Sequence, residues 1–363
     1  MSQAFHGGNL AAAAHRFNRD PNRFIDFSSN LNIWLEPALP DGKEILREIV
    51  RYPEVDATTL RRQLAAVYRV EPSHVLPTAG AAEALYLAMR LFAGKRVGII
   101  EPAFSDYSRA CRAAGVSFES ILLSPHEWFL PVTAYEDRLE DFDVVVFGNP
   151  NNPTGHFHPR AGLIELMRRF PQKAWVVDEA FIEFVERHEE ETLLSVLREF
   201  PPLIVIGSLT KSWRVPGLRL GFLAASRREW LEKAALCQPP WSINGVAQLW
   251  AKCNLTPGGW AQMKKSLADL PGLRARFTAQ LESLPEVGVH RAHANFLLLE
   301  LLTASAAGLY DALGHEGFLV RVCDSFSGVP PDRFIRVAIR NERENHQLVR
   351  AMAKFFEAAL QPA

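Results

Sequence analysis

The sequence lacks an excess of charge of either sign. Its 363 residues include 40 lysines and arginines against 41 aspartates and glutamates, which gives a formal net charge of −1. A nearly neutral chain has no broad field that would attract nucleic acid or an anionic membrane. The expected ligand is therefore a small molecule, and any function of an arginine must be local.

Cysteines and long apolar runs are also scarce. The four cysteines stand far apart and include no CxxC pair. This argues against a disulfide framework or a zinc site, so we expect no metal and a reducing compartment. No apolar stretch approaches the ~18 residues of a membrane span, and the first residues lack the basic and apolar pattern of a secretion signal. These absences predict a cytoplasmic protein without a membrane partner.

Short apolar runs rich in β-forming residues alternate with longer segments of helical period. Strands are expected at 97–100, 144–147, 175–177, 203–206 and 220–224. This alternation predicts an α/β fold with a central, mostly parallel sheet covered by helices on both faces.

A change of composition divides the chain. Near residues 255–259 the sequence changes to LTPGG, and helical patterns then alternate with the runs NFLLLEL, FLVRV and FIRVAIR. We therefore expect a large α/β domain and a smaller C-terminal α+β domain. The expected parts are an N-terminal arm that packs on the small domain (1–40), the large domain (41–250) and the small domain (251–363).

The segment SLTKSWRVPGLRLGF follows the strand-like run LIVIG, so Ser208, Lys211 and Arg219 come where a strand's carboxyl end meets a loop. Ligand sites in open α/β sheets gather at that edge. A lysine that is partly desolvated beside another cation has a lowered pKa and can form an imine, while Arg219 and Ser208 can bind a phosphate dianion. A lone lysine is more often a solvated loop residue, so the assignment of Lys211 to a site depends on the neighbouring motifs.

Two polar residues follow other strands. Asp178 ends the strand in VVDEAF, where a carboxylate can pair with the protonated pyridine nitrogen of a cofactor. Asn152 lies in the turn FGNPNNPTG, where a fixed amide can hydrogen-bond a phenolic oxygen. The simpler interpretations are a strand-end acid for Asp178 and an ordinary turn for Asn152.

The last two motifs offer a phosphate site and a ring. Gly80, Ala81 and Ala82 open a helix whose free N–H groups suit a phosphate, and Phe104 in EPAFSDY can stack on a pyridine face. Taken singly, these are a plain helix start and a core aromatic. Taken together with the lysine, acid, amide and arginine, they indicate pyridoxal 5'-phosphate, carried by Lys211 as a Schiff base.

The motifs GAAE, EPAF, NPNNPTG, DEAF, SLTK and PGLRLG resemble those of the fold-type I, class I and II aminotransferases. The upstream RYPE and downstream IRVAIR segments extend the resemblance over nearly the whole chain. Within the superfamily, the cues HGGN, IDFSSNLN, DEAF and SLTK are most similar to the threonine-phosphate decarboxylases of cobalamin biosynthesis. The next most similar group is the histidinol-phosphate aminotransferases.

The resemblance implies further roles. Tyr52 in RYPE matches a tyrosine that reaches the cofactor phosphate across a dimer interface, so two chains would complete each site. Arg336 matches the arginine that binds the substrate carboxylate. Additional substrate contacts are implied for residues of the C-terminal region and of the arm: Arg321, Arg340, His6 and Asn32.

Two departures from the family pattern bear on the substrate. Phe181 stands where many aminotransferases have a tyrosine that hydrogen-bonds the cofactor's phenolic oxygen, and this form favours a lyase. Trp34 and Leu35 replace the Asn-Pro-Leu-Gly turn that borders the family's substrate pocket.

The favoured function is decarboxylation of an O-phosphorylated amino acid, foremost L-threonine O-3-phosphate to (R)-1-aminopropan-2-yl phosphate. The alternatives are transamination of histidinol phosphate or a related amino acid, other imine chemistry, and a non-catalytic cofactor-binding module.

Overall fold

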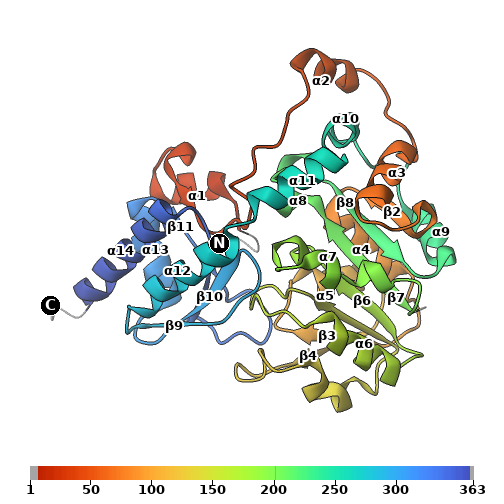
Figure 1. The fold of residues 1–363 in the computed structure, drawn as a ribbon. Coiled ribbons are helices and arrows are strands. Elements are labelled where there is room, and N and C mark those ends of the chain that lie inside the picture. Colours follow the sequence, from red (N-terminus) through yellow and green to blue (C-terminus); the bar gives the residue numbers. More distant parts are fainter. Residues whose placement is uncertain (1–6, 201, 360–363) are drawn as a thin grey trace.

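A computed structural model describes residues 7–200 and 202–359 (Figure 1). Its largest element is a seven-stranded sheet in the order β2-β8-β7-β6-β5-β3-β4. Strands β3 to β7 pair in parallel, whereas β8 runs antiparallel to β7 and β2. The expected α/β fold with a mostly parallel sheet is confirmed. The strands are β2 (Val75–Thr78), β3 (Val97–Glu101), β4 (Phe118–Leu122), β5 (Val144–Gly148), β6 (Ala174–Asp178), β7 (Leu203–Ser208) and β8 (Gly221–Ala225).

Helices cover both faces of this sheet because its strands are apolar on both sides. Val144 and Val146 of β5 pack in one buried cluster, and Val145 and Phe147 pack in another. Successive side chains of a strand point to opposite faces, so an unbroken apolar run is buried on both. The covering helices are α3 (Thr58–Val67), α4 (Gly80–Arg90), α5 (Asp106–Ala114), α6 (Arg160–Arg169), α9 (Arg228–Cys237) and α10 (Gly245–Asn254).

The C-terminal part contains an antiparallel sheet in the order β12-β13-β10-β9. The run FIRVA forms β13, which pairs with both β10 and β12. The proposed limit at 250/251 falls inside α10, which contacts α2 (Gly42–Ile49) and α3 of the large part. The elements are α11 (Pro257–Ser266), α12 (Leu270–Glu282), β9 (Val287–Val289), β10 (Phe296–Leu301), α13 (Ala306–Glu316), β11 (Phe318–Leu319), β12 (Arg321–Val322), β13 (Phe334–Ala338) and α14 (Glu342–Ala359).

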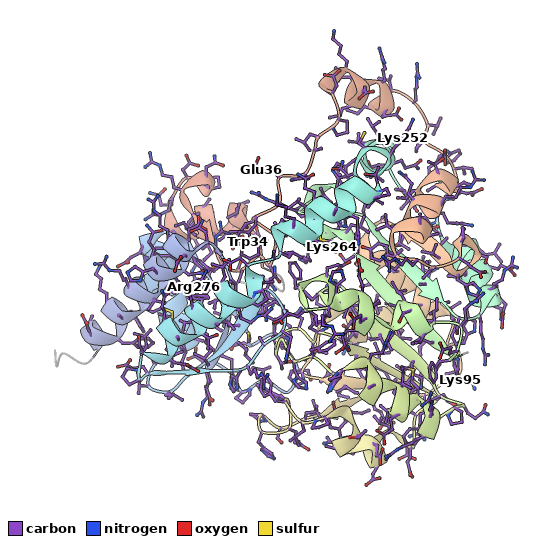
Figure 2. All side chains as sticks on the ribbon, viewed as in Figure 1. Trp34, Glu36, Lys95, Lys252, Lys264 and Arg276 are labelled. Carbon is purple, nitrogen blue, oxygen red and sulfur yellow. The ribbon has the colours of Figure 1, made fainter. Side chains whose placement is uncertain are left out.

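The N-terminal segment lies against this C-terminal part (Figure 1). Strand β1 (Ile25–Asp26) pairs in parallel with β11, and α1 (Leu10–Phe17) contacts α13. Gly314 allows this contact, because a Cβ there would lie 2.1 Å from the Phe17 ring. Figure 2 shows Trp34 and Glu36 on the extended segment that leads to α2 (Gly42–Ile49).

Short elements complete the described part of the chain. They are α7 (His188–Glu191), α8 (Leu209–Ser212) and the 3-10 turns η1 (Pro21–Arg23), η2 (Pro72–His74), η3 (Val132–Leu139), η4 (Ile182–Phe184), η5 (Leu193–Val196) and η6 (Pro216–Leu218). None of the described helices is both long and apolar enough to cross a membrane.

Candidate active site

A cavity of about 310 Å³ lies where the carboxyl ends of β6 and β7 meet the arm and the C-terminal sheet. This position agrees with the rule that ligands bind outside the carboxyl ends of parallel strands. Most of the predicted site residues line it: Ala81, Ala82, Phe104, Asn152, Asp178, Ser208, Lys211, Arg219, Arg321 and Arg336.

Lys211 lies on the short helix α8, which begins directly after β7. Ser208 begins this helix, and its Oγ accepts a hydrogen bond from the Thr210 N–H at 3.3 Å. Burial, followed by the nearby guanidinium groups of Arg336 and Arg219, lowers the Lys211 pKa from 10.5 to about 8. A substantial fraction of this lysine is therefore neutral near pH 8, which is the form that attacks an aldehyde.

Asp178 ends β6, and each of its carboxylate oxygens accepts one hydrogen bond. The Ala180 N–H donates to Oδ1 at 2.9 Å, and the Tyr107 hydroxyl donates to Oδ2 at 3.0 Å. Burial raises the Asp178 pKa, while these two donors and the charge of Lys211 oppose the rise. The result is an oriented acid that can hold a proton on a ring nitrogen beside it.

Two glycines let Arg219 and the start of α4 converge. Gly80 has a φ of +83°, and a Cβ on it would lie 2.6 Å from Arg219 Nη2. A Cβ on Gly221 of β8 would lie 2.6 Å from the backbone nitrogen of Ala81. The helix N-terminus and the guanidinium thus form a cup that attracts a dianion. Gly80 does not itself line the cavity but gives Arg219 its room.

These features fit pyridoxal 5'-phosphate. The cup suits its phosphate, Lys211 suits its aldehyde and Asp178 suits its pyridine nitrogen. Phe104 lines the same cavity and packs edge to face on Tyr107, with ring centroids 5.9 Å apart.

Two arginines on neighbouring strands of the C-terminal sheet also line the cavity. Arg321 of β12 is the cross-strand partner of Arg336 of β13, and both are at least nine-tenths buried. Arg336 donates to Asn152 Oδ1 at 2.5 Å and to the Ser28 carbonyl at 2.9 Å. Burial lowers the pKa of both, for Arg336 to about 10. Like charges opposite each other repel, so an anion in the cavity would stabilise both.

The sequence pattern of the aminotransferase class I and II family matches residues 30–352. The chain belongs to this family. It is 31% identical to the threonine-phosphate decarboxylase of Salmonella typhimurium, with 96% of this chain and 95% of that protein covered. The resemblance inferred from the motifs is therefore confirmed.

Two solved structures of family members share the fold. One is L-threonine-O-3-phosphate decarboxylase from Porphyromonas gingivalis, with a TM-score of 0.79 and 26% identity over 91% of this chain and 99% of that one. The other is the histidinol-phosphate aminotransferase from Clostridium acetobutylicum, with a TM-score of 0.82 and 28% identity over 92% and 99%. The chain thus resembles both groups to a similar degree.

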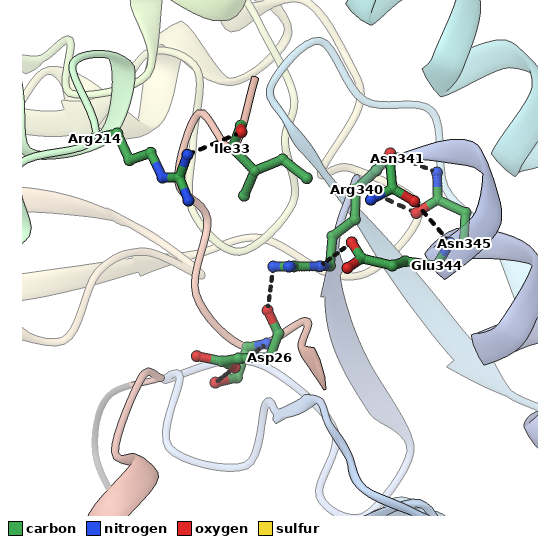
Figure 3. Close-up of polar contacts among 8 residues, drawn as sticks. Asp26, Ile33, Arg214, Arg340, Asn341, Glu344 and Asn345 are labelled. Carbon is green, nitrogen blue, oxygen red and sulfur yellow. Dashed lines mark hydrogen bonds and ion pairs between the residues drawn. The ribbon is translucent and has the colours of Figure 1, made fainter. Parts of the chain in front are cut away.

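Arg340, which the family resemblance assigned to the substrate, does not line the cavity. Figure 3 shows its guanidinium between Asp26 and Glu344. Its Nε donates to the Glu344 carboxylate at 2.8 Å and its Nη1 to the Asp26 carbonyl at 3.1 Å. Arg340 thus pairs with Glu344, and of the three predicted substrate arginines Arg321 and Arg336 line the cavity.

Asn32 also lies outside the cavity lining and is fully buried. Its side-chain nitrogen donates to the Ser212 carbonyl and to Ser266 Oγ, both at 2.8 Å, and its N–H donates to the Lys211 carbonyl at 2.9 Å. Asn32 therefore supports the helix of Lys211 in this structure and makes no wall for a substrate.

The remaining predicted residues lie elsewhere. Tyr52 is 83% exposed, packs against Trp241 with ring centroids 4.9 Å apart, and does not line the cavity of its own chain. His6 lies outside the described residues.

The unusual Trp34–Leu35 segment does not line the cavity either. Leu35 is buried in the core, and Arg214 donates to the carbonyls of Ile33 and Leu35 at 3.1 and 3.0 Å (Figure 3 shows the Ile33 bond). The segment is thus anchored to the loop after Lys211.

Sequence reasoning missed several lining residues. Ser28, Ser29 and Asn30 follow β1, and Tyr107 lies one helical turn after Phe104. The segment FSSN was noted only as a family cue, although three polar residues after a strand are themselves a signal. The i, i+3 spacing of Phe104 and Tyr107 was the available signal for the tyrosine.

Proposed function

We propose that the protein is a pyridoxal 5'-phosphate-dependent decarboxylase of an O-phosphorylated amino acid, foremost L-threonine O-3-phosphate, in cobalamin biosynthesis. The observation that carries this proposal is the buried pair Arg321 and Arg336, which lines the same cavity as Lys211. Two cations on one wall match a substrate with two anions, a carboxylate and a phosphate.

The cofactor residues have separate tasks in this proposal. Ala81, Ala82, Ser208 and Arg219 bind the cofactor phosphate, and Lys211 forms the covalent link. Asp178 keeps the ring nitrogen protonated. When bound, the cofactor accepts the electron pair released at the substrate's α-carbon.

The arginines hold the substrate for decarboxylation. Arg336 is fixed by Asn152 and Ser28, so it binds an anion in a defined place, and Arg321 binds the second anion next to it. The bond from the α-carbon to the carboxylate breaks, carbon dioxide leaves, and Lys211 supplies a proton to the α-carbon. The product is (R)-1-aminopropan-2-yl phosphate.

Transamination is the second candidate, because the fold is equally similar to a histidinol-phosphate aminotransferase. In that reaction Lys211 removes a proton from the α-carbon, and the carboxylate or alcohol group stays in place. The same cofactor residues serve both reactions. The residues that bind the substrate therefore determine which of the two reactions occurs.

Incubation of the purified holoenzyme with L-threonine O-3-phosphate separates the two candidates. We expect stoichiometric release of carbon dioxide and the aminoalkyl phosphate. Transfer of the amino group from histidinol phosphate to an added keto acid, with formation of the corresponding amino acid and no carbon dioxide release, would establish transamination instead.

We further propose a homodimer with shared sites. Apolar side chains on and around α2 are exposed, among them Leu46 and Ile49 at 63% and Val50 at 79%. Such an apolar surface is typical of an interface. Tyr52 lies beside it and would reach the cofactor phosphate of a second chain. The four unpaired cysteines suit a reducing compartment, for which we propose the cytoplasm.

Mixed dimers test the shared site. Homodimers of the Tyr52→Ala chain and homodimers of the Lys211→Ala chain should each have low enzymatic activity. A verified heterodimer should regain activity, because one of its two sites receives both intact residues. If heterodimers stay inactive, each chain builds its own site.

A further inference from the structure

Tyr107 is a buried residue beside the cofactor acid that neither the sequence motifs nor the proposed reaction uses. It lies on α5, one helical turn after Phe104, and is 2% exposed. Its hydroxyl donates to Asp178 Oδ2 at 3.0 Å. Phe104, just before α5, and Tyr107, in its first turn, thus supply the cavity with an aromatic ring and with a hydrogen-bond donor to its acid.

The neighbouring strand is shaped to admit this hydroxyl. Gly148 ends β5 and is the cross-strand partner of Asp178. A Cβ at position 148 would lie 3.0 Å from the Tyr107 oxygen, closer than ordinary contact. Any larger residue at this strand end would therefore push the hydroxyl away from the carboxylate.

The surroundings keep the tyrosine a donor. Burial and the Asp178 charge hold the Tyr107 pKa well above its usual value, so the hydroxyl keeps its proton at working pH. A hydrogen bond to a carboxylate stabilises its charged form and makes it a weaker base. The Tyr107 bond opposes the rise in Asp178 pKa that burial causes.

We propose that Tyr107 is a positioning residue that keeps the proton shared by Asp178 and the cofactor's pyridine nitrogen on the nitrogen. This rests on the proposed function in one respect, the placement of that nitrogen beside Asp178. With the hydroxyl present, the carboxylate stays charged and the ring remains a strong electron acceptor. Without it, the more basic carboxylate takes the proton, and the ring accepts electrons less well.

The test compares Tyr107→Phe with a matched control, Tyr68→Phe, as holoenzymes. Tyr68 also donates to a buried carboxylate, Glu183 Oε1, at 2.9 Å, but it does not line the cavity. Both changes delete one hydroxyl from a partly buried tyrosine–carboxylate hydrogen bond. Their effects on thermal stability should therefore be similar, which isolates the effect on the cofactor.

The main measurement is the ¹⁵N resonance of ring-labelled cofactor bound to each protein. We expect Tyr107→Phe to move the resonance toward that of a neutral pyridine and to lower kcat about tenfold, with KM changed less than about twofold. Tyr68→Phe should keep the wild-type resonance and kcat. An unmoved resonance in Tyr107→Phe overturns the proposal, even if activity falls.

Gly148→Ala is a second route if Tyr107→Phe does not fold. Its methyl group should displace the hydroxyl and shift the resonance in the same direction by a smaller amount. An unshifted resonance in folded Gly148→Ala also counts against the proposal. The resonance is measured without substrate, so this test does not depend on whether the wild-type enzyme decarboxylates or transaminates. A wrong assignment of the reaction would be recognised separately, from the products of the substrate assay.

Discussion

The cavity has two walls that are built in different ways. The cofactor wall, made by Ala81, Ala82, Asp178, Ser208, Lys211 and Arg219, stands on or next to strand ends of the large sheet. The substrate wall comprises Ser28, Ser29, Asn30, Arg321 and Arg336 and joins the N-terminal arm to the C-terminal sheet. Its arginines stand on the paired strands β12 and β13, and its serines and asparagine follow the arm strand β1, which pairs with β11. The arm residues also contact β13 through side-chain bonds such as that from Arg336 to the Ser28 carbonyl.

This difference implies a division of labour. Backbone pairing fixes the strand ends, so the cofactor wall keeps its geometry if the C-terminal loops change. The substrate wall can vary without disturbing the sheet. We therefore expect substitutions in the first wall to change the bound cofactor, and substitutions in the second to change substrate preference alone.

The largest expected effect is that of Lys211→Ala. Loss of the covalent link and of the acid and base group should reduce turnover by about 1,000-fold or more. Wild-type protein reduced with borohydride should carry the cofactor on Lys211 in peptide mapping. Lys264→Ala is the control, since its ammonium pairs with Glu189 at 2.8 Å outside the cavity. An adduct on another lysine would refute the assignment.

Asp178→Asn should come next. The amide cannot stabilise the ring nitrogen by charge, so turnover should fall about 100-fold, or about 2.7 kcal/mol of transition-state stabilisation. The cofactor should remain bound, because Lys211 and the phosphate cup are intact. Absorbance of bound cofactor and steady-state kinetics measure both quantities. Near-normal turnover would remove Asp178 from the mechanism.

Arg321→Ala sharpens the comparison of the walls. Loss of a charge-assisted contact should reduce kcat/KM for L-threonine O-3-phosphate about 100-fold and for threonine far less, with cofactor affinity unchanged. The matched variant is Arg340→Ala, whose arginine pairs with Glu344 outside the cavity. Arg340→Ala should lower kcat/KM less than about tenfold, and by a similar factor for both substrates. Equal losses in the two variants would contradict the assignment of Arg321 to the phosphate.

The smallest predicted effect is a pH dependence. With a Lys211 pKa of about 8, its neutral fraction, and hence the rate of cofactor addition to the cofactor-free protein, should rise about fivefold between pH 7 and 8 and then level off. In the unfolded chain this lysine keeps its ordinary pKa near 10.5, so between about pH 8 and 10.5 the unfolded state binds more protons than the folded state. Lys211 therefore makes the cofactor-free protein more stable as pH rises from about 8 to 10.5. A rate that keeps rising past pH 9 would contradict the lowered pKa.

The sequence was informative where local order determines position. Asp178 and Lys211 follow apolar strands directly, so the pattern of a parallel sheet was enough to bring them to one edge. Phe104 and the start of α4 were found in the same way. Regular secondary structure carries such residues to predictable places.

The substrate wall could not be derived in this way. Arg340 and Arg321 look alike as arginines at strand ends, and only the tertiary structure shows that Glu344 binds the first. Asn32 was assigned to a substrate, but its amide holds the helix of Lys211. Long side chains choose partners by packing between segments far apart in sequence, which no local pattern records.

The pairing of β1 with β11 has a consequence for how the chain is made. Ile25 pairs with Phe318, about 290 residues later, and the Phe27 carbonyl accepts a bond from the Ala338 N–H. On the ribosome, the arm must wait until residues 318 and 338 have been made before these bonds can form. The large sheet, whose strands end by Ala225, can assemble first, and the substrate wall is then completed only after β13 has been made.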